Sequence, residues 1–261
     1  MDRNNIDKLA STPEDRVLLA KLWDKVQTGV RKNIMGSTCF LSPREQQLAS
    51  CLFGQQEGLL SFGGYEDAER KMLIFLPDYL DDGVLWDEVS PIVCIRAAFY
   101  KTEAPSHRDF LGALMGAGVA REAVGDILVG AESCDFFVTA QIAPYILQNF
   151  ESAGRTSLKL SAVPLSQARQ PEQKITELRD TVASLRLDSI ISAGFRISRG
   201  AAAGYIAAGR AAVDGLPCEK ADKAVEEGCK ISVRGLGKVR LQKVNGTTKK
   251  GRISVVIHRY E

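Results

Sequence analysis

Residues 185–210, LRLDSIISAGFRISRGAAAGYIAAGR, decide the fold of the C-terminal part of the chain. The apolar residues within 187–191 form one face of a short helix, which Gly194 is expected to end. Ser198 has the side chain of a helix cap, and Gly209 can take the left-handed conformation that closes a helix. The stretch therefore predicts two short helices joined by a tight turn.

The pattern changes from helix to strand after this stretch. Asp214-Gly215 and Asn245-Gly246 are residue pairs that tolerate positive φ and favour tight turns between strands. The predicted strands are residues 211–213, 230–234, 238–244 and 252–259. We therefore expect the two helices to pack on a small antiparallel sheet.

The charge of the chain is divided unevenly along its length. Residues 1–181 hold 19 Lys and Arg against 25 Asp and Glu, a net charge of −6, whereas residues 182–261 hold 15 against 7, a net charge of +8. A basic domain beside an acidic body is typical of a module that binds a polyanion, although a solvated basic face would look the same. Arg199, at the predicted start of the second helix, is a candidate phosphate ligand, and the alternative is an ordinary solvated arginine.

The N-terminal region, residues 1–71, is predicted to be helical. Thr12-Pro13 supplies a cap and a proline at the first helical position, and Ser42 with Glu45 has the spacing of a capping box. Residues 72–76, an apolar run before Pro77, indicate a buried strand.

The middle region, residues 72–167, is predicted to be a ferredoxin-like (RRM-like) domain, with the strand at 72–76 available for pairing. Its elements in order are a strand at 92–100, a helix at 107–115, strands at 126–129 and 135–139, a helix at 140–150 and a strand at 157–162. The polar residues 168–181 are predicted to be a linker to a C-terminal domain at 182–261, so the fold class is α+β.

The middle region holds two features that could contact RNA. Phe136 and Phe137 on the predicted strand could offer a ring for base stacking, but one of two neighbouring strand residues must face the core. The second feature is the cluster His107-Arg108-Asp109 at a predicted helix start. A structural role is favoured for it, because Asp109 stands where an acid supports the Ser106 cap, and contact with RNA is the alternative.

Metal, cofactor and membrane chemistry are not expected. The six cysteines form no C-x-x-C pair, and both histidines are far from them in the sequence, so we expect neither a zinc site nor a disulfide framework nor a cofactor. No apolar run approaches the roughly 18 residues of a membrane span. The charged start lacks a signal core, so the protein is expected to be cytoplasmic.

The C-terminal region resembles the S4 RNA-binding domain. The resemblance covers residues 185–240: an R-L-D motif, then S-R opening a helix, then G-x-x-x-V-D-G, then an E-G turn before a strand. It implies an RNA-facing surface formed by Arg186, Arg196, Ser198, Arg199, Arg210, Asp214, Lys220, Arg234, Lys238 and Arg240. Within this surface, the carboxylate of Asp214 would hold a neighbouring arginine in place or accept a hydrogen bond from an RNA hydroxyl. The alternative is that Asp214 is only a turn residue.

The rest of the chain resembles the YlmH family of ribosome-associated RNA-binding proteins. The motifs that carry the resemblance are FLSPRE (40–45), FGGYEDAERK (62–71), IFLPDY (74–79), SHRDFLGALMGAG (106–118), GDI (125–127) and CDFFVTA (134–140). The resemblance implies a noncatalytic factor that binds rRNA and peptidyl-tRNA on a stalled large (50S) ribosomal subunit in bacterial ribosome quality control. We expect a monomer that binds no DNA and no membrane.

Two other functions stay open from the sequence: an RNA-modifying enzyme with its active site in the middle domain, and a protein adaptor in cell division. Enzymes that carry an S4 domain in front of a large catalytic domain do not fit, because only about 20 residues follow the domain here. Asp188 could be mistaken for the catalytic acid of a pseudouridine synthase. It is rejected because Leu185 replaces the glycine of that motif and because the acid falls inside a helix of the binding domain.

Overall fold

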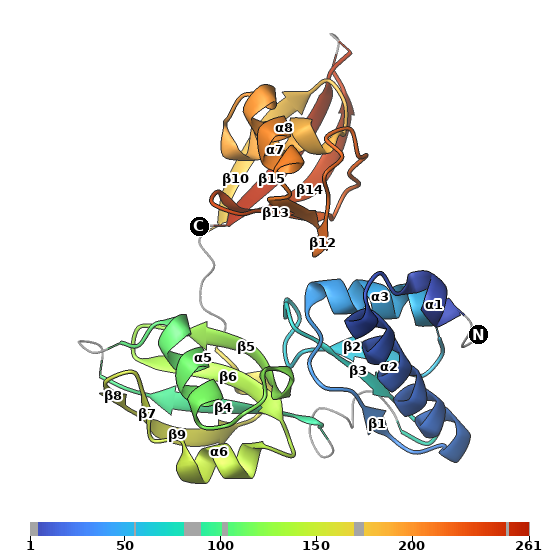
Figure 1. The fold of residues 1–261 in the computed structure, drawn as a ribbon. Helices are drawn as coiled ribbons and strands as arrows, with labels where there is room; N and C mark the ends of the chain where they lie inside the picture. The colour runs from blue at the N-terminus through green and yellow to red at the C-terminus, as the bar shows by residue number, and fades with distance from the viewer. Residues whose placement is uncertain are drawn as a thin grey trace. The chain divides into compact units, whose positions relative to one another are not determined.

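The computed structural model describes residues 5–54, 56–80, 90–100, 104–169, 175–248 and 251–260. The chain folds into two compact units, residues 1–171 and residues 172–261, coloured blue to yellow-green and yellow-orange to red in Figure 1. No helix in the described part of the chain has the length and apolar character needed to cross a membrane.

The N-terminal part of the first unit combines helices with a small sheet. Its elements are α1 (Ile6–Leu9), α2 (Pro13–Lys32), β1 (Gly36–Ser37), α3 (Pro43–Phe53), β2 (Leu59–Phe62) and β3 (Met72–Phe75). Both predicted helix starts are confirmed, since Thr12 accepts from the Asp15 backbone and Ser42 forms a capping box with Glu45. The prediction of a purely helical region was incomplete, because residues 36–37 and 59–62 form the strands β1 and β2 by pairing with β3. They flank β3 in the order β1-β3-β2.

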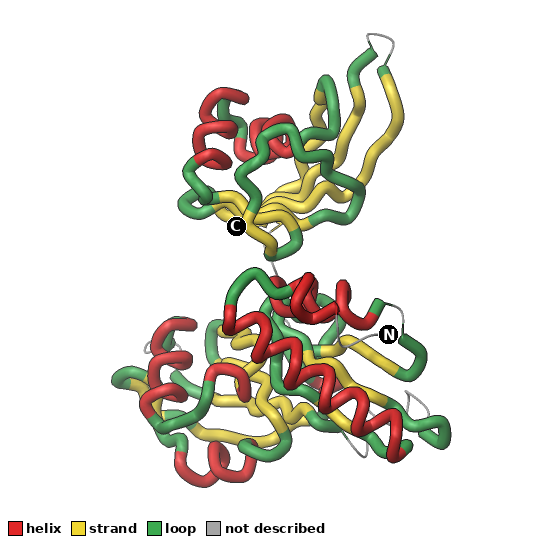
Figure 2. Tube along the Cα trace, turned by 45° about the vertical axis from the view of Figure 1, so that its right-hand side comes forward, coloured by secondary structure: helices red, strands yellow, loops and turns green. Residues whose placement is uncertain are grey.

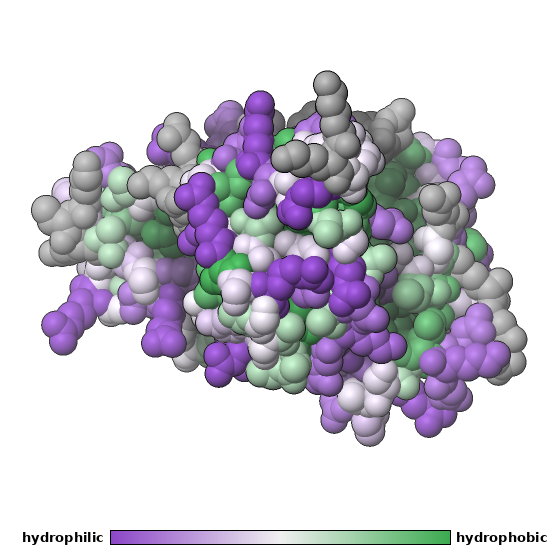
Figure 3. Space-filling model, turned by 90° about the horizontal axis from the view of Figure 1, so that it is seen from above, coloured by the Kyte–Doolittle hydropathy of each residue, from purple (hydrophilic) through white to green (hydrophobic). Residues whose placement is uncertain are grey.

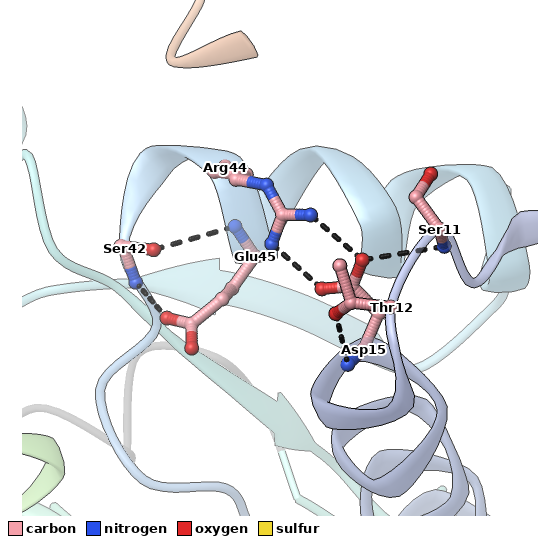
Figure 4. Close-up of polar contacts among 6 residues, drawn as sticks. All are labelled: Ser11, Thr12, Asp15, Ser42, Arg44 and Glu45. Carbon is pink, nitrogen blue, oxygen red and sulfur yellow. Dashed lines mark hydrogen bonds and ion pairs between the residues drawn. The ribbon is translucent and has the colours of Figure 1, made fainter. Parts of the chain in front are cut away.

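An ion pair between partly exposed Arg44 and buried Asp15 joins α2 to α3. Arg44 donates from Nη1 to Oδ1 of Asp15 and from Nη2 to Oδ2, both at 2.7 Å, and Asp15 is only 2% exposed (Figure 4). The backbone N–H of Ser11 also donates to Oδ2 at 3.3 Å. The hydrogen bonds from Arg44 hold the pKa of Asp15 below its ordinary value despite the cost of burial. Asp15 thus fixes how α2 and α3 pack together. The sequence predicted where each helix begins but not this contact.

The middle part of the first unit confirms the predicted ferredoxin-like order. Its main elements are β4 (Ile92–Ala98), α5 (His107–Gly116), β5 (Val124–Val129), β6 (Ser133–Thr139), α6 (Ala143–Asn149) and β9 (Lys159–Val163). Short additions are η3 (Arg121–Ala123), the hairpin β7 (Ser152–Ala153) and β8 (Thr156–Ser157), and η4 (Leu165–Gln167). The antiparallel sheet has the order β5-β6-β4-β9, which puts the two central strands β6 and β4 side by side (Figures 1 and 2).

Both faces of this sheet are covered. Phe136 packs on the helix side with Phe110 of α5, whereas Phe137 packs on the other side with Met72 and Ile74 of β3. Phe136 and Phe137 are each 0% exposed, so the suggestion that one of them stacks on an RNA base is wrong. The strand at 72–76 was expected to be available to this sheet, but β3 pairs with β1 and β2 and contacts the middle sheet through its side chains.

Gly64 makes the close approach between the two parts of the first unit possible. It has φ = +103°, and a Cβ added there would lie 2.3 Å from Cδ1 of Phe137. The next residue, Tyr65, stacks on Phe137 with ring centroids 5.2 Å apart and donates to Asp126 at 2.8 Å. Gly64 and Tyr65 of the FGGYEDAERK motif therefore have a packing role.

We expect Gly64→Ala to lower the free energy of unfolding of the first unit by about 2 kcal/mol, through overpacking against Phe137 and an unfavourable φ. Tryptophan fluorescence during urea titration measures this, because both tryptophans lie within residues 1–171. Gly112→Ala is the matched control, since a Cβ there meets no heavy atom within 4 Å. Equal stability of the two variants would contradict the packing role of Gly64.

In its described residues, the second unit consists of two helices and a six-stranded antiparallel sheet. Its elements are β10 (Ile175–Val182), α7 (Leu187–Phe195), α8 (Arg199–Ala207), β11 (Ala211–Val213), β12 (Leu216–Pro217), β13 (Lys230–Val233), β14 (Gly237–Thr247) and β15 (Ile253–Tyr260). The strand order is β10-β15-β14-β13-β11-β12. Both helices bury apolar residues in one core with one face of the sheet, as the sequence predicts (Figures 1 and 2).

Three local predictions for this unit need correction. Residues 175–181 were assigned to the linker but belong to β10, an edge strand that buries only Leu178 and Val182 and so lacks an apolar pattern. Gly194 does not end α7, which continues to Phe195 and is closed by Arg196 with φ = +54°. Asn245-Gly246 is part of β14, near a register irregularity, and the hairpin to β15 turns after Thr247.

Candidate nucleic-acid interface

The second unit carries the basic charge of the protein. Residues 172–261 contain 17 Lys and Arg against 10 Asp and Glu, a net charge of +7, whereas residues 1–171 contain 17 against 22, a net charge of −5. The contrast noted in the sequence therefore coincides with the division into two folded units. A polyanion would be attracted to the second unit.

An arginine pair, Arg186 and Arg199, lies where the two helices begin. Arg186 is the N-cap residue of α7, and Arg199 is the first residue of α8. Both guanidinium groups contact the same carboxylate, that of Asp188. Arg199 donates from Nη2 to Oδ2 at 2.8 Å, and Arg186 donates from Nε and Nη2 at 3.3 and 3.4 Å.

Asp188 is the buried centre of this arrangement. It is 6% exposed, whereas the side chains of Arg186 and Arg199 are 42% and 52% exposed. Burial raises the pKa of Asp188, but hydrogen bonds from Arg199 and Arg186 outweigh burial, so the pKa lies below its ordinary value. The carboxylate is therefore ionised near neutral pH. It orients two guanidinium groups, each of which keeps N–H donors for a further anion.

The N-terminal N–H groups of α7 already have partners. Leu187 donates to the carbonyl of Lys223, and Asp188 donates to the carbonyl of Ala221. These carbonyls belong to the loop that also holds Lys220, which is exposed. At the start of α8, the Ser198 side chain accepts from the Ala201 backbone, as the sequence predicts. An anion at the arginine pair would thus be held mainly by guanidinium groups.

A second group of predicted residues lies at the end of the sheet. Arg210, Arg234 and Lys238 line a pocket of about 390 Å³, together with Ser232 and the glycines beside them. The guanidinium carbon of Arg210 lies 5.8 Å from the centroid of the Tyr205 ring, a cation–π distance. Three of the predicted residues therefore come together from the residue before β11, the β13–β14 turn and β14.

The other predicted residues have more local surroundings. Asp214 has φ = +49°, and its carboxylate accepts from the Lys230 backbone at 2.8 Å, which is the geometry of a turn residue. Arg240 is half-buried and donates from Nε to the Gly228 carbonyl at 3.3 Å. Arg196 is exposed at the left-handed end of α7.

The ten predicted residues do not form one continuous surface. The helices cover the sheet face that carries Val239 and Leu241. Lys238 and Arg240 alternate with these residues along β14 and so lie on the opposite face. The sequence identified the basic residues, but it did not predict on which face of the sheet each of them lies.

The polar residues Ser106 and Asp109 of the middle domain have a structural role. Ser106 and Asp109 form a capping box at the start of α5, which confirms the structural role predicted for Asp109. Hydrogen bonds from Ser106 lower the pKa of Asp109. His107 and Arg108 beside it are exposed.

The sequence did not reveal that Asp188 orients two arginines. From the sequence alone, the residue suggests only a catalytic acid, and the surrounding motif excludes that role. The R-L-D spacing is the available signal, because an arginine at the cap and an acid in the first turn of the helix are close in space. The third partner, Arg199, is 11 residues away, and only the helix-turn-helix geometry brings it near.

Comparisons with known proteins place this fold in a family. Residues 98–167 match a family model described as a putative RNA-binding domain in YlmH. The ribosome-associated protein quality control protein P2 of Bacillus subtilis is 34% identical over 226 residues, which cover 86% of this chain and 87% of the relative. A solved structure of the cell division protein ylmH from Streptococcus pneumoniae matches 60% of this chain and 96% of its own, with 21% identity and a TM-score of 0.48. By the extent of its likeness to the Bacillus protein, the chain belongs to the YlmH family.

Proposed function

We propose that the protein is a noncatalytic RNA-binding factor that associates with the large ribosomal subunit and contacts rRNA and peptidyl-tRNA during ribosome quality control. The observation that carries the proposal is the arginine pair, oriented by a buried carboxylate in the basic unit. Two fixed guanidinium groups match the geometry of phosphate oxygens better than freely rotating cations do. The name of the Bacillus relative and the YlmH family model support the ribosomal and RNA parts of the proposal.

The second unit is proposed to act as an S4-type RNA-binding domain. Its two short helices, the S-R start of α8 and the turn at Asp214-Gly215 agree with the pattern from which the resemblance was drawn. The arginine pair would bind the backbone of structured RNA, with Lys220 beside it. Arg210, Arg234 and Lys238 would bind a separate phosphate at the end of the sheet.

The first unit is proposed to position the basic unit on the cytoplasmic ribosome. Its central sheet has Met72 and Ile74 on one side and α5 and α6 on the other, which excludes base stacking on that sheet as a mode of RNA binding. Contacts of the middle domain with RNA would have to come from loops, helix ends or strand edges, such as the exposed His107 and Arg108.

Electrostatics should dominate the affinity of this protein for RNA. If about five to seven phosphates are neutralised, the slope of the logarithm of the binding constant against the logarithm of salt should be roughly −4 to −6. A titration with rRNA fragments between low and moderate salt measures the slope. An affinity that did not change with salt would exclude the proposed binding mode.

Sedimentation of the tagged protein through sucrose gradients of bacterial lysate tests the ribosomal part. We expect comigration with free large subunits, weakened by salt and abolished in an Arg199→Ala variant. Lys21→Gln, a charge change on an exposed site of α2, should comigrate like the wild type. Wild-type protein that stayed at the top of the gradient at every salt concentration would overturn the ribosomal proposal. An unchanged RNA mass after incubation would separate a binder from an enzyme that adds a chemical group to RNA.

A further inference from the structure

The sheet of the second unit has a second face, opposite α7 and α8. We call it the open face. Its members follow from the strand register, in which residues paired across strands point to the same side. They are Ile175, Glu177, Arg179 and Thr181 of β10, Ser254, Val256, His258 and Tyr260 of β15, Lys238, Arg240 and Lys243 of β14, Lys230 and Ser232 of β13, and Ala212 of β11.

The assignment of these residues to one face rests on the alternation of buried and exposed side chains. In β13, Ile231 and Val233 are buried in the core with the helices, whereas Lys230 is exposed. In β14, Val239 and Leu241 are buried in the same core. Both helices of this unit in the described part of the chain contribute to that core, so they lie on the other side from the open face.

The open face is strongly basic. It carries five Lys or Arg residues and one acid, Glu177. Glu177 accepts from Arg179 at 2.9 Å and lies 3.7 Å from Nε2 of His258. The hydrogen bond from Arg179 lowers the pKa of Glu177, so this acid is charged at neutral pH and partly offsets the basic field.

Two ring side chains stand among these cations. Tyr260 is paired with Lys238, and His258 is paired with Arg240, on neighbouring strands. His258 and Tyr260 are two residues apart on β15, so their rings lie on the same face, and both residues are partly exposed. Figure 3, a space-filling view from above, shows hydrophilic side chains interspersed with apolar areas on the side of the molecule that it presents.

We propose that the open face binds single-stranded RNA, with bases stacked on Tyr260 and His258 and phosphates held by Arg240 and Lys238. Base stacking on rings beside a basic track is how proteins bind single strands without strong sequence preference. An apolar protein partner fits less well, since Ile175 is the one exposed large apolar side chain among the described residues of this face. The row through Glu177, His258, Arg240 and Lys230 is entirely polar. The inference rests on the proposed RNA-binding function, and it adds a surface distinct from the arginine pair.

The geometry also assigns a role to Glu177. A carboxylate beside the stacking rings repels phosphate and engages Arg179 and His258, so it should weaken RNA binding at this face. Its removal should therefore strengthen binding. A gain of affinity is a sharp test because an unfolded or damaged variant cannot produce it.

The test is fluorescence anisotropy with a labelled, unstructured eight-nucleotide adenylate RNA and the full-length protein. We expect Tyr260→Leu to weaken binding at least about fivefold, because an apolar side chain of similar reach cannot stack on a base. Arg240→Gln should weaken it and lower the salt slope by about one. Glu177→Gln should strengthen it about two- to threefold. Lys21→Gln should bind like the wild type.

The outcomes distinguish this inference from the proposed function. If the open-face variants bind the oligonucleotide like the wild type while Arg199→Ala does not, the open face is not an RNA surface and the inference is overturned. The inference is also overturned if Glu177→Gln lowers the affinity. If wild-type protein binds neither the oligonucleotide nor the large subunit, both the inference and the proposed function fail. Ultraviolet crosslinking to a 5-iodouridine oligonucleotide should label the peptide that contains Tyr260.

Discussion

A double variant, Arg186→Ala with Arg199→Ala, is expected to bind structured RNA about 100-fold more weakly than the wild type, because each arginine supplies a charge-assisted hydrogen bond of roughly 1.5 kcal/mol to phosphate. Both side chains are about half exposed, and both are fixed on Asp188, so they are available to a ligand and already oriented. Filter binding or anisotropy with an rRNA hairpin gives the affinity. The salt slope should fall by about two.

The control for this variant must separate the removal of phosphate ligands from a disturbed fold, because truncating both arginines leaves Asp188 buried without its cationic partners. Arg186→Lys with Arg199→Lys keeps both charges near Asp188 but removes the planar fork. We expect it to retain the salt slope and to bind about tenfold more weakly. Circular dichroism should show a folded second unit. Wild-type affinity in the folded alanine variant would refute the role of the arginine pair.

Asp188→Asn tests whether the carboxylate only orients the arginines. The substitution keeps the shape of the side chain and leaves both guanidinium groups in place, with a weaker hold. We expect RNA affinity to fall about three- to tenfold at low salt, since preorganisation is reduced while the number of cations is unchanged. The salt slope should stay that of the wild type. A changed slope would show that Asp188 affects the number of phosphates bound and not the orientation alone.

The features that the sequence predicted well are those set by neighbouring residues. Thr12, Ser42 and Ser198 each cap a helix at the position expected, because a cap is an interaction over two or three residues. The ferredoxin-like order also followed from local patterns. The turn at Asp214-Gly215 formed as expected, with positive φ at both residues.

The features that were missed depend on contacts distant in the sequence. β10 buries only Leu178 and Val182, so its strand character comes from pairing with β15 about 80 residues later, and no local pattern indicates it. The burial of Phe137 likewise depends on β3, which packs against it from another part of the unit. For the candidate site, residue type was enough to predict which basic residues take part. The strand register was needed to assign these residues to the two faces of the sheet. The helix-turn-helix geometry was needed to place Asp188 between Arg186 and Arg199.

The second large effect concerns the stability of the first unit. Arg96 and Asp135 face each other on β4 and β6, and Arg96 donates to both carboxylate oxygens at 2.7 Å. Asp135 is 1% exposed, and the Arg96 side chain is 18% exposed. The same arginine donates to the Gln167 carbonyl at 2.8 Å, and the Arg169 backbone donates to Asp135 at 2.7 Å, so the pair also holds the chain that follows η4.

Arg96→Ala is expected to destabilise the first unit by about 3–5 kcal/mol, because it leaves a buried carboxylate with a single backbone donor in place of a bidentate partner. Urea titration followed by tryptophan fluorescence measures the change. The double variant Arg96→Met with Asp135→Val removes the charge together with its partner, and it should recover most of the missing stability. Such recovery would show that the penalty is that of an unpaired buried charge. A double variant as unstable as Arg96→Ala would instead mean that the hydrogen bonds to Gln167 and Arg169 carry the stability, with the ion pair serving mainly to place them.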